Sequence, residues 1–144
     1  MINSGVLWVY MKKILILSAN PHTGSFNHSL ARKYERSARA AGNEVVMVHI
    51  ADLAFDYNLQ PGAVLEPDLV EQQTHIAWAD TVVLCFPIWW YGVPANLKAF
   101  FDRVLTPGFA YKYPHPWPVL RIFMPKRLLK GKRVRIISTQ DSFR

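Results

Sequence analysis

Two short segments carry the residues that could do chemistry, and each follows an apolar run. The first, SANPHTGSFN (residues 18–27), combines hydroxyl and amide side chains with the start of a helical pattern. The second, PIWWYG (residues 87–92), sets two tryptophans and a tyrosine side by side. Hydroxyl groups and free helix N–H groups bind anions, and aromatic faces stack on planar rings. Together they indicate a site for a planar cofactor that carries phosphate.

The first segment lacks both common nucleotide-binding patterns, G-x-G-x-x-G and G-x-x-x-x-G-K-[ST]. It could still hold an anion, because it joins a predicted strand to a helix whose first N–H groups are free. The alternative is an ordinary capped turn, in which Ser25 only satisfies the helix start. The segment alone leaves both interpretations open.

The second segment is harder to explain as core. Consecutive residues cannot share one buried face, so Trp89, Trp90 and Tyr91 cannot all point inward. Trp89 alone could do so. The segment therefore predicts an exposed aromatic surface at the end of a strand.

The elements that position these segments alternate along the chain. Four apolar runs read as strands, and three amphipathic stretches between them read as helices. The strands are expected at 12–19, 44–50, 81–86 and 133–139, and the helices at 25–42, 66–80 and 94–105. This alternation predicts an α/β protein with an open parallel sheet covered by helices on both faces. Ligands of such folds bind at the carboxyl ends of the strands, which is where both segments lie.

The first expected helix has Ser25 as its N-cap and Gly42 as its C-terminal stop. Its apolar residues recur at i, i+4 and predict one inward face. These residues are Phe26, Leu30, Tyr34 and Ala38.

Composition bounds the class of protein. A chain of 144 residues with 51% apolar residues makes about one domain with a real core. The single cysteine, Cys85, lies in an apolar run and reads as a buried thiol, which favours a reducing compartment. No apolar run is long enough to span a membrane and no secretory signal is present, so we expect a cytoplasmic protein. Residues 1–10 are expected to be an N-terminal extension, and residues 11–144 the folded domain.

The net charge of +7 is concentrated in the last third of the chain. Residues 121–135 carry seven basic residues and no acidic one. Such a run can attract nucleic acid, anionic lipid or a phosphorylated cofactor, but it is more often a solvated face. No nucleic-acid motif or metal-ligand spacing accompanies this run, so we expect neither a nucleic acid nor a metal ion to bind. The Pro-rich stretch 106–126 is either a lid or a partner surface.

Three segments, ILILSANPHTGSFNHSLA, FPIWWYGVPANLKAFFDRVL and LLKGKRVRIISTQDS, together resemble the flavodoxin-like NAD(P)H:quinone oxidoreductases. The second is the most specific of them. The resemblance runs from about Lys12 to Ser142 and implies a strand order of 2-1-3-4, followed by a fifth strand. It also implies bound FMN or FAD, NAD(P)H as electron donor, a quinone as acceptor, and a homodimer formed through the Pro-rich stretch.

By position, the resemblance assigns cofactor-binding residues but no catalytic side chain, because the flavin itself carries the hydride. His22 and His28 receive no role and are expected to be exposed turn residues. The flavin phosphates and ribityl chain are assigned to Ser18, Asn20, Ser25, Phe26 and Asn27, and the ring to Pro87, Ile88, Trp89, Trp90, Tyr91 and Gly92.

The resemblance also implies that the fold is incomplete. Family members continue after the fourth strand with a helix, a fifth strand and a terminal helix. The fourth strand is therefore expected to be an exposed edge, and the chain to be a truncated member with impaired activity. Two other functions stay open. One is a regulatory subunit of a membrane transporter, docked through residues 121–135. The other is a flavodoxin-type electron carrier, which the basic charge and paired tryptophans disfavour.

Overall fold

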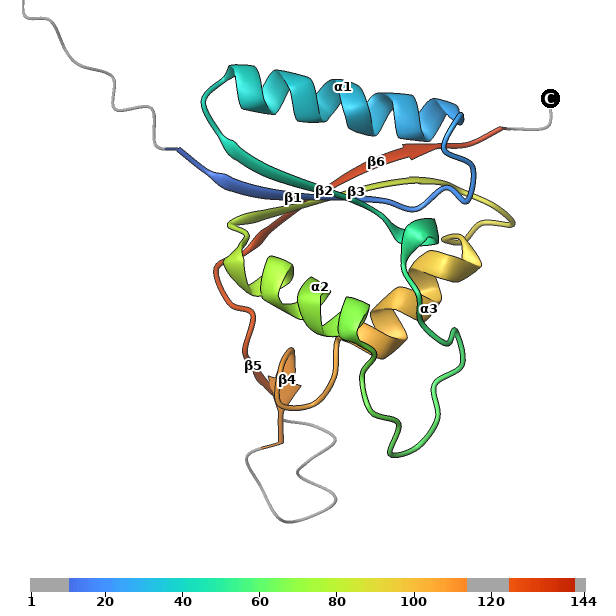
Figure 1. Cartoon of the computed structure of the whole chain (residues 1–144), viewed down its shortest axis with the longest axis vertical. Helices are drawn as coiled ribbons and strands as arrows, with labels where there is room; N and C mark the ends of the chain where they lie inside the picture. Colours follow the sequence, from blue (N-terminus) through green and yellow to red (C-terminus); the bar gives the residue numbers. More distant parts are fainter. Residues whose placement is uncertain (1–10, 114–124, 142–144) are drawn as a thin grey trace, which may run out of the picture.

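The computed structural model describes residues 11–113 and 125–141, and its centre is a four-stranded parallel sheet (Figure 1). The strands are β1 (Lys13–Ser18), β2 (Glu44–His49), β3 (Thr81–Pro87) and β6 (Arg133–Thr139). Their order in the sheet is β2-β1-β3-β6. The predicted α/β class and the predicted order 2-1-3-4 are confirmed, with β6 as the fourth strand.

The register brings the carboxyl ends of the strands to one edge. Ser18 pairs with Cys85 on β3 and with His49 on β2, and Pro87 pairs with Thr139 on β6. Strand β3 is buried at every position. A continuous apolar run is typical of a parallel strand that is covered on both faces.

Helix α1 (Phe26–Ala40) lies on one face of the sheet, and α2 (Pro67–Trp78) and α3 (Ala95–Val104) lie on the other (Figure 1). Alternate strand side chains therefore enter two separate cores. Ile14, Ile16 and Val83 pack on the α1 side. The larger core on the other side contains Leu15, Leu17, Val82, Leu84, Phe86, Leu97 and Phe100.

Both predicted ends of the first helix are confirmed. The Ser25 hydroxyl accepts a hydrogen bond from the backbone N–H of His28 at 3.2 Å, and Gly42 has a φ of 80°. The predicted inward face is partly wrong, because Phe26 is 69% exposed. The buried residues are Asn27, Ala31 and Ala38. Small alanines let α1 approach the sheet closely. Asn27 is buried on the same face because it accepts hydrogen bonds from Cys85 on β3 and from Thr139 on β6.

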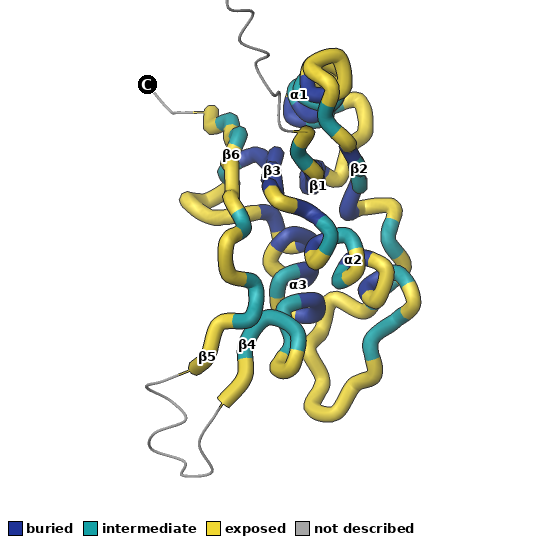
Figure 2. The backbone as a smooth tube through the Cα atoms, turned by 90° about the vertical axis from the view of Figure 1, so that its left-hand side faces the viewer, coloured by how far each residue is buried: buried dark blue, intermediate teal, exposed yellow. Residues whose placement is uncertain are grey.

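Strand β6 is an exposed edge, as predicted. Within the described ranges it pairs only with β3, and its residues are exposed or half-buried (Figure 2). Val134 and Ile136 are each 62% exposed. They pair in register with Val82 and Leu84, whose side chains enter the larger core. The apolar surface of that core therefore continues uncovered onto β6.

Two connections contain elements that the sequence did not predict. A short 3-10 helix, η1 (Ile50–Asp52), follows β2, and β4 (Tyr111–Lys112) pairs antiparallel with β5 (Lys126–Arg127). The expected extension 1–10, the middle of the Pro-rich stretch and the first residues of the basic run lie outside the described residues. In the two described ranges, no helix combines the length and the apolar character that crossing a membrane requires.

One buried cation holds the long connection between η1 and α2. The Arg103 guanidinium donates to the carbonyl of Asp56 at 2.6 Å, to that of Asn58 at 3.3 Å and to the Glu66 carboxylate at 2.7 Å. The backbone N–H of Asp56 also donates to Glu66, and together with Arg103 it lowers the pKa of that carboxyl group.

We expect Arg103→Met to lower the free energy of unfolding by about 2–3 kcal/mol, because two backbone carbonyls and the Glu66 carboxylate lose a charged donor. Urea denaturation measures this change. Lys98→Met is the matched control, since Lys98 and Asp102 form an exposed pair on the same helix. Such a pair contributes about 0.5 kcal/mol or less. Equal losses in the two variants would contradict the anchoring role of Arg103.

Candidate functional site

The aromatic segment forms a tight turn directly after β3. Trp89 and Gly92 exchange two backbone hydrogen bonds, of 3.1 and 3.0 Å. Trp90 and Tyr91 between them have φ angles of 51° and 60°. Positive φ at both central residues defines a type I′ turn, whose usual occupants are Asn and Gly. Large side chains in this conformation are strained, and such strain is concentrated at functional sites.

The turn presents its rings to solvent. Trp90 is 96% exposed and Tyr91 is 92% exposed, and Trp89 is also on the surface. The prediction that these three residues cannot all be core is confirmed, and Trp89 is the least exposed of them at 46%. Flat apolar rings held out by a strained backbone are poorly explained by packing alone.

A cleft of about 700 Å³ lies beside this turn. The backbone N–H of Ile88 donates to the carbonyl of Thr139 at 2.7 Å and so ties the aromatic segment to the end of β6. Five of the six site residues predicted in the aromatic segment line the cleft, and the sixth, Gly92, does not. The lining consists of Pro87, Ile88, Trp89, Trp90, Tyr91, Thr139, Gln140 and Asp141.

The sequence analysis assigned no site residue in 139–141. One signal could have found them: Thr139 ends the fourth predicted strand and the other two follow it, at the edge where parallel folds bind ligands. The structure brings their side chains opposite the aromatic turn, which gives the cleft one apolar and one polar wall.

The first loop lies at the same edge of the sheet, but its predicted site residues are mostly buried. Ser18, Asn20 and Asn27 are buried, Ser25 is half-buried and Phe26 is exposed. None of them lines the cleft. The Asn20 side chain accepts the backbone N–H of His22 at 2.9 Å, and the loop reaches α1 through the Ser25 cap.

Asn27 connects the first loop with the cleft. Its side-chain oxygen accepts a hydrogen bond from the Thr139 hydroxyl at 3.0 Å, and its backbone carbonyl accepts one from the Cys85 thiol at 3.0 Å. Its amide nitrogen, Nδ2, is buried and has no partner in the described structure. Buried donors are nearly always satisfied, so an unpaired one beside a cleft fits a ligand that offers an acceptor.

His28 is held in the first turn of α1 and is not the exposed turn residue that was expected, whereas His22 is exposed. The Nδ1 atom of His28 lies 3.4 Å from the Ser18 hydroxyl, and Arg32 donates a hydrogen bond to Nε2 of His28 at 3.3 Å. Burial, followed by the nearby His49 and Arg32, lowers the pKa of His28. The neutral ring can therefore accept from Arg32 and donate to Ser18.

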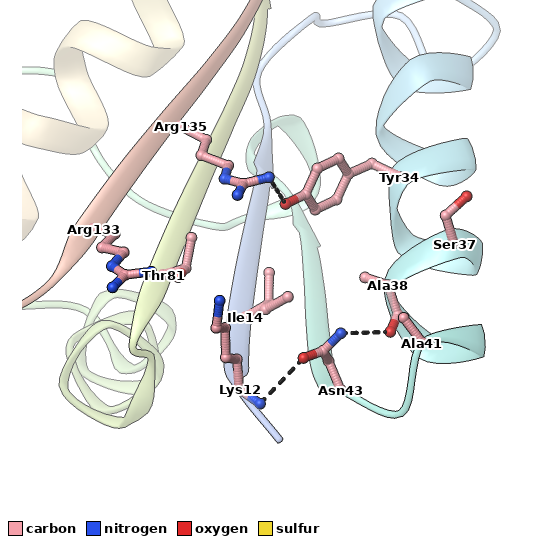
Figure 3. Close-up of a pocket in the computed structure, with 10 residues that line it drawn as sticks. All are labelled: Lys12, Ile14, Tyr34, Ser37, Ala38, Ala41, Asn43, Thr81, Arg133 and Arg135. Carbon is pink, nitrogen blue, oxygen red and sulfur yellow. Dashed lines mark hydrogen bonds between the residues drawn. The ribbon is translucent and has the colours of Figure 1, made fainter. Parts of the chain in front are cut away.

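A second cleft, of about 400 Å³, lies at the other end of the strands, between α1 and β6 (Figure 3). Lys12, Arg133 and Arg135 lie around it, and Arg135 donates to the Tyr34 hydroxyl at 3.2 Å. Neither predicted segment contributes to it. Among the described residues, no group of His, Cys, Asp and Glu could hold a metal ion.

Fold and site together define a class: an open parallel α/β protein with a ligand cleft at the carboxyl edge of its sheet. The sequence matches the family described as having a flavodoxin-like fold over residues 12–144. The chain belongs to this family.

The relatives that it resembles are oxidoreductases by name. The chain is 31% identical over 127 residues to NAD(P)H dehydrogenase [quinone] 1 of Rattus norvegicus, covering 72% of this chain and 46% of the relative. It is 34% identical over 107 residues to an uncharacterized NAD(P)H oxidoreductase of Haemophilus influenzae, covering 68% and 52%. The chain thus spans about half the length of these curated relatives.

Solved structures agree on the fold. Smu.1420 from Streptococcus mutans superposes with a TM-score of 0.68 and 30% identity, covering 87% of this chain and 66% of that one. The NAD(P)H:quinone oxidoreductase from Methanothermobacter marburgensis superposes with a TM-score of 0.69, covering 90% of this chain and 85% of that one. At 22% identity, the second likeness shows the fold alone.

The strained turn gives a stability prediction. We expect the double substitution Trp90→Asn with Tyr91→Gly to raise the free energy of unfolding by about 1–2 kcal/mol, because both residues tolerate positive φ. Urea denaturation of the ligand-free protein measures it. Tyr57→Asn is the control, since it removes a partly exposed aromatic ring outside the turn. A double variant no more stable than the wild type would show that the turn is not strained.

Cys85 is predicted to be unreactive in the folded protein. Burial raises the pKa of its thiol to about 11, and the thiolate is the reactive form. A colorimetric thiol reagent should label the native protein only at the rate of unfolding, and label it fully in denaturant. A Ser29→Cys variant, with a thiol on the exposed face of α1, serves as the reactive control. Equally fast labelling of Cys85 and the control would contradict its burial.

Proposed function

We propose that the chain binds a flavin at the carboxyl edge of its sheet and works as an NAD(P)H:quinone oxidoreductase. The observation that carries the proposal is the aromatic turn, which holds Trp90 and Tyr91 in a strained conformation beside a cleft of about 700 Å³. A planar ring of flavin size stacks favourably on such side chains. The names of the relatives supply the reaction class.

The residues present fit this cofactor. The segment from Pro87 to Gly92 would hold the ring system, and Thr139 to Asp141 would form the opposite wall. The first loop would hold the phosphate end with the free N–H groups at the start of α1. Asn27 lies between the two, and its unpaired Nδ2 would donate to the flavin. The first-loop set is Ser18, Asn20, Ser25, Phe26 and Asn27.

The bound flavin would supply the hydride chemistry, taking two electrons from NAD(P)H and passing them to a quinone. The chain's own residues bind and orient. Trp90 and Tyr91 would give the ring a flat apolar surface and shield it from water, and the backbone of the turn would help to orient it. No side chain of this chain needs to act as a nucleophile, and Cys85 is too deeply buried to do so.

Several finer points belong to the same proposal. The phosphate end admits FMN or FAD, and the donor is NADH or NADPH. The acceptor is a small quinone, the working form is a homodimer, and the protein is cytoplasmic. The described part of the basic run makes local contacts: Lys132 donates to the carbonyls of Ala77 and Ala79, both at 2.7 Å. This supports an ordinary structural face more than a docking site on a transporter.

Flavin titration tests the proposal. The purified chain should quench the fluorescence of FMN or FAD, and it should then consume NAD(P)H when menadione is added. The variant with Trp90→Asn and Tyr91→Gly keeps the turn but removes both rings, so flavin affinity should fall at least about tenfold. Tyr57→Asn should leave it unchanged.

Two outcomes would count against the proposal. If the wild-type chain bound neither FMN nor FAD, the cofactor would be wrong. If it bound flavin but the turn variant bound equally well, the cleft would be the wrong site.

A further inference from the structure

His49 is a buried polar residue that neither the sequence analysis nor the proposed function uses. It is the last residue of β2 and pairs in register with Ser18, directly before the first loop. Its side chain is only 5% exposed. Its Nε2 lies 2.8 Å from the backbone carbonyl of Asn20, a residue 29 positions earlier in the chain. A strong hydrogen bond therefore runs from the second strand to the loop that follows the first.

The partners of His49 determine where its protons lie. A carbonyl only accepts, so Nε2 must carry the hydrogen in the bond to Asn20. Nδ1 lies 3.3 Å from Oδ1 of Asp52 in η1. An ionised carboxylate also only accepts, so that contact becomes a hydrogen bond when Nδ1 is protonated as well. In either state the bond to Asn20 is kept, and Asp52 reinforces it when the ring is charged.

The hydrogen bond from His49 fixes the first loop at a place where the backbone makes few other hydrogen bonds. Pro21 follows Asn20 and has no N–H to donate. The Asn20 side chain already accepts the N–H of His22, and the carbonyl of His22 accepts the N–H of Ser25. The orientation of the Asn20 carbonyl thus sets where the short run 22–25 begins, and this run ends at the cap of α1.

The surroundings of His49 are also defined. The His28 ring from α1 meets it edge-to-face, with ring centroids 5.0 Å apart and an interplanar angle of 87°. Arg32 donates a hydrogen bond to His28, and Asp52 of η1 lies next to His49. These are the titratable and charged groups that face the pair of histidines. His49 itself lines no part of the cleft.

We propose that His49, reinforced by Asp52, is a positioning residue that holds the first loop in its phosphate-binding shape. It acts through the Asn20 carbonyl and touches no cofactor. This inference rests on the proposed function, since it concerns the phosphate end of the same flavin site. It predicts that His49 matters for ligands that carry phosphate and not for the flavin ring.

Paired titrations with FMN and riboflavin test the inference, because the two differ only in the phosphate. His49→Leu removes the donor at similar volume, and FMN affinity should fall about tenfold for one lost hydrogen bond. Riboflavin affinity should change less than about twofold. His49→Gln keeps an N–H donor and should restore most of the FMN affinity. His75→Gln, at a half-buried histidine on α2, is the matched control and should change neither ligand.

A merely structural role would weaken FMN and riboflavin together, and that result would overturn the inference, as would unchanged FMN binding in His49→Leu. A measurement without flavin separates this failure from failure of the proposed function. In nitrogen-15 NMR spectra, the backbone amides of His22 and Ser25 should shift in His49→Leu and return towards wild type in His49→Gln. Unshifted amides would overturn the loop-positioning role even if the protein bound no flavin.

Discussion

The shared direction of four paired strands is the constraint on which the site depends. Because β1, β2 and β6 all run parallel to their neighbours, every strand delivers its following loop to the same edge. Strand β3 is buried on both faces and pairs on both sides, so a slip of one residue would exchange its two sets of side chains between the cores. The register is thereby fixed, and with it the pairing of Ser18 with Cys85 and of Pro87 with Thr139 at the carboxyl edge of the sheet.

The site adds local strain to this rigid frame. Two bulky residues occupy left-handed positions in the turn after β3. The turn is held at both ends: Ile88 bonds to Thr139 on β6, and α3 starts at Ala95, three residues after Gly92. A turn built from Asn and Gly would be easier to form but would offer no aromatic surface. The sequence therefore gives up stability to present an aromatic surface at this edge of the sheet.

Much of the fold could be predicted from local pattern. Runs such as TVVLCF define strands, Ser25 and Gly42 mark helix ends, and the aromatic segment cannot be core because consecutive residues face different ways. Phe26 was predicted inward on spacing alone, and the spacing could not show that Asn27 would take that place to reach Thr139. The periodicity of a helix identifies its apolar residues but does not say which polar residue has a buried partner.

The contacts that sequence reasoning missed join residues far apart in the chain. Arg103 meets Glu66 across 37 positions, and Asn27 meets Thr139 across 112. A single sequence carries no local sign of such pairs, because their contribution to stability depends on burial that only the assembled fold creates. The short β4–β5 ladder was missed for a related reason, because two-residue strands have no period to detect.

The exposed strand β6 links the stability of the sheet to the shape of the cleft. Val134 and Ile136 extend an apolar core into solvent, while Arg133 and Arg135 on the opposite face discourage edge-to-edge pairing with other chains. The same strand ends at Thr139, which bonds to both Ile88 and Asn27. Whatever covers β6 would therefore reduce the freedom of the wall that faces the aromatic turn. Because the wall begins at the last residue of the edge strand and continues directly from it, covering this edge would stabilise the fold and order the site together.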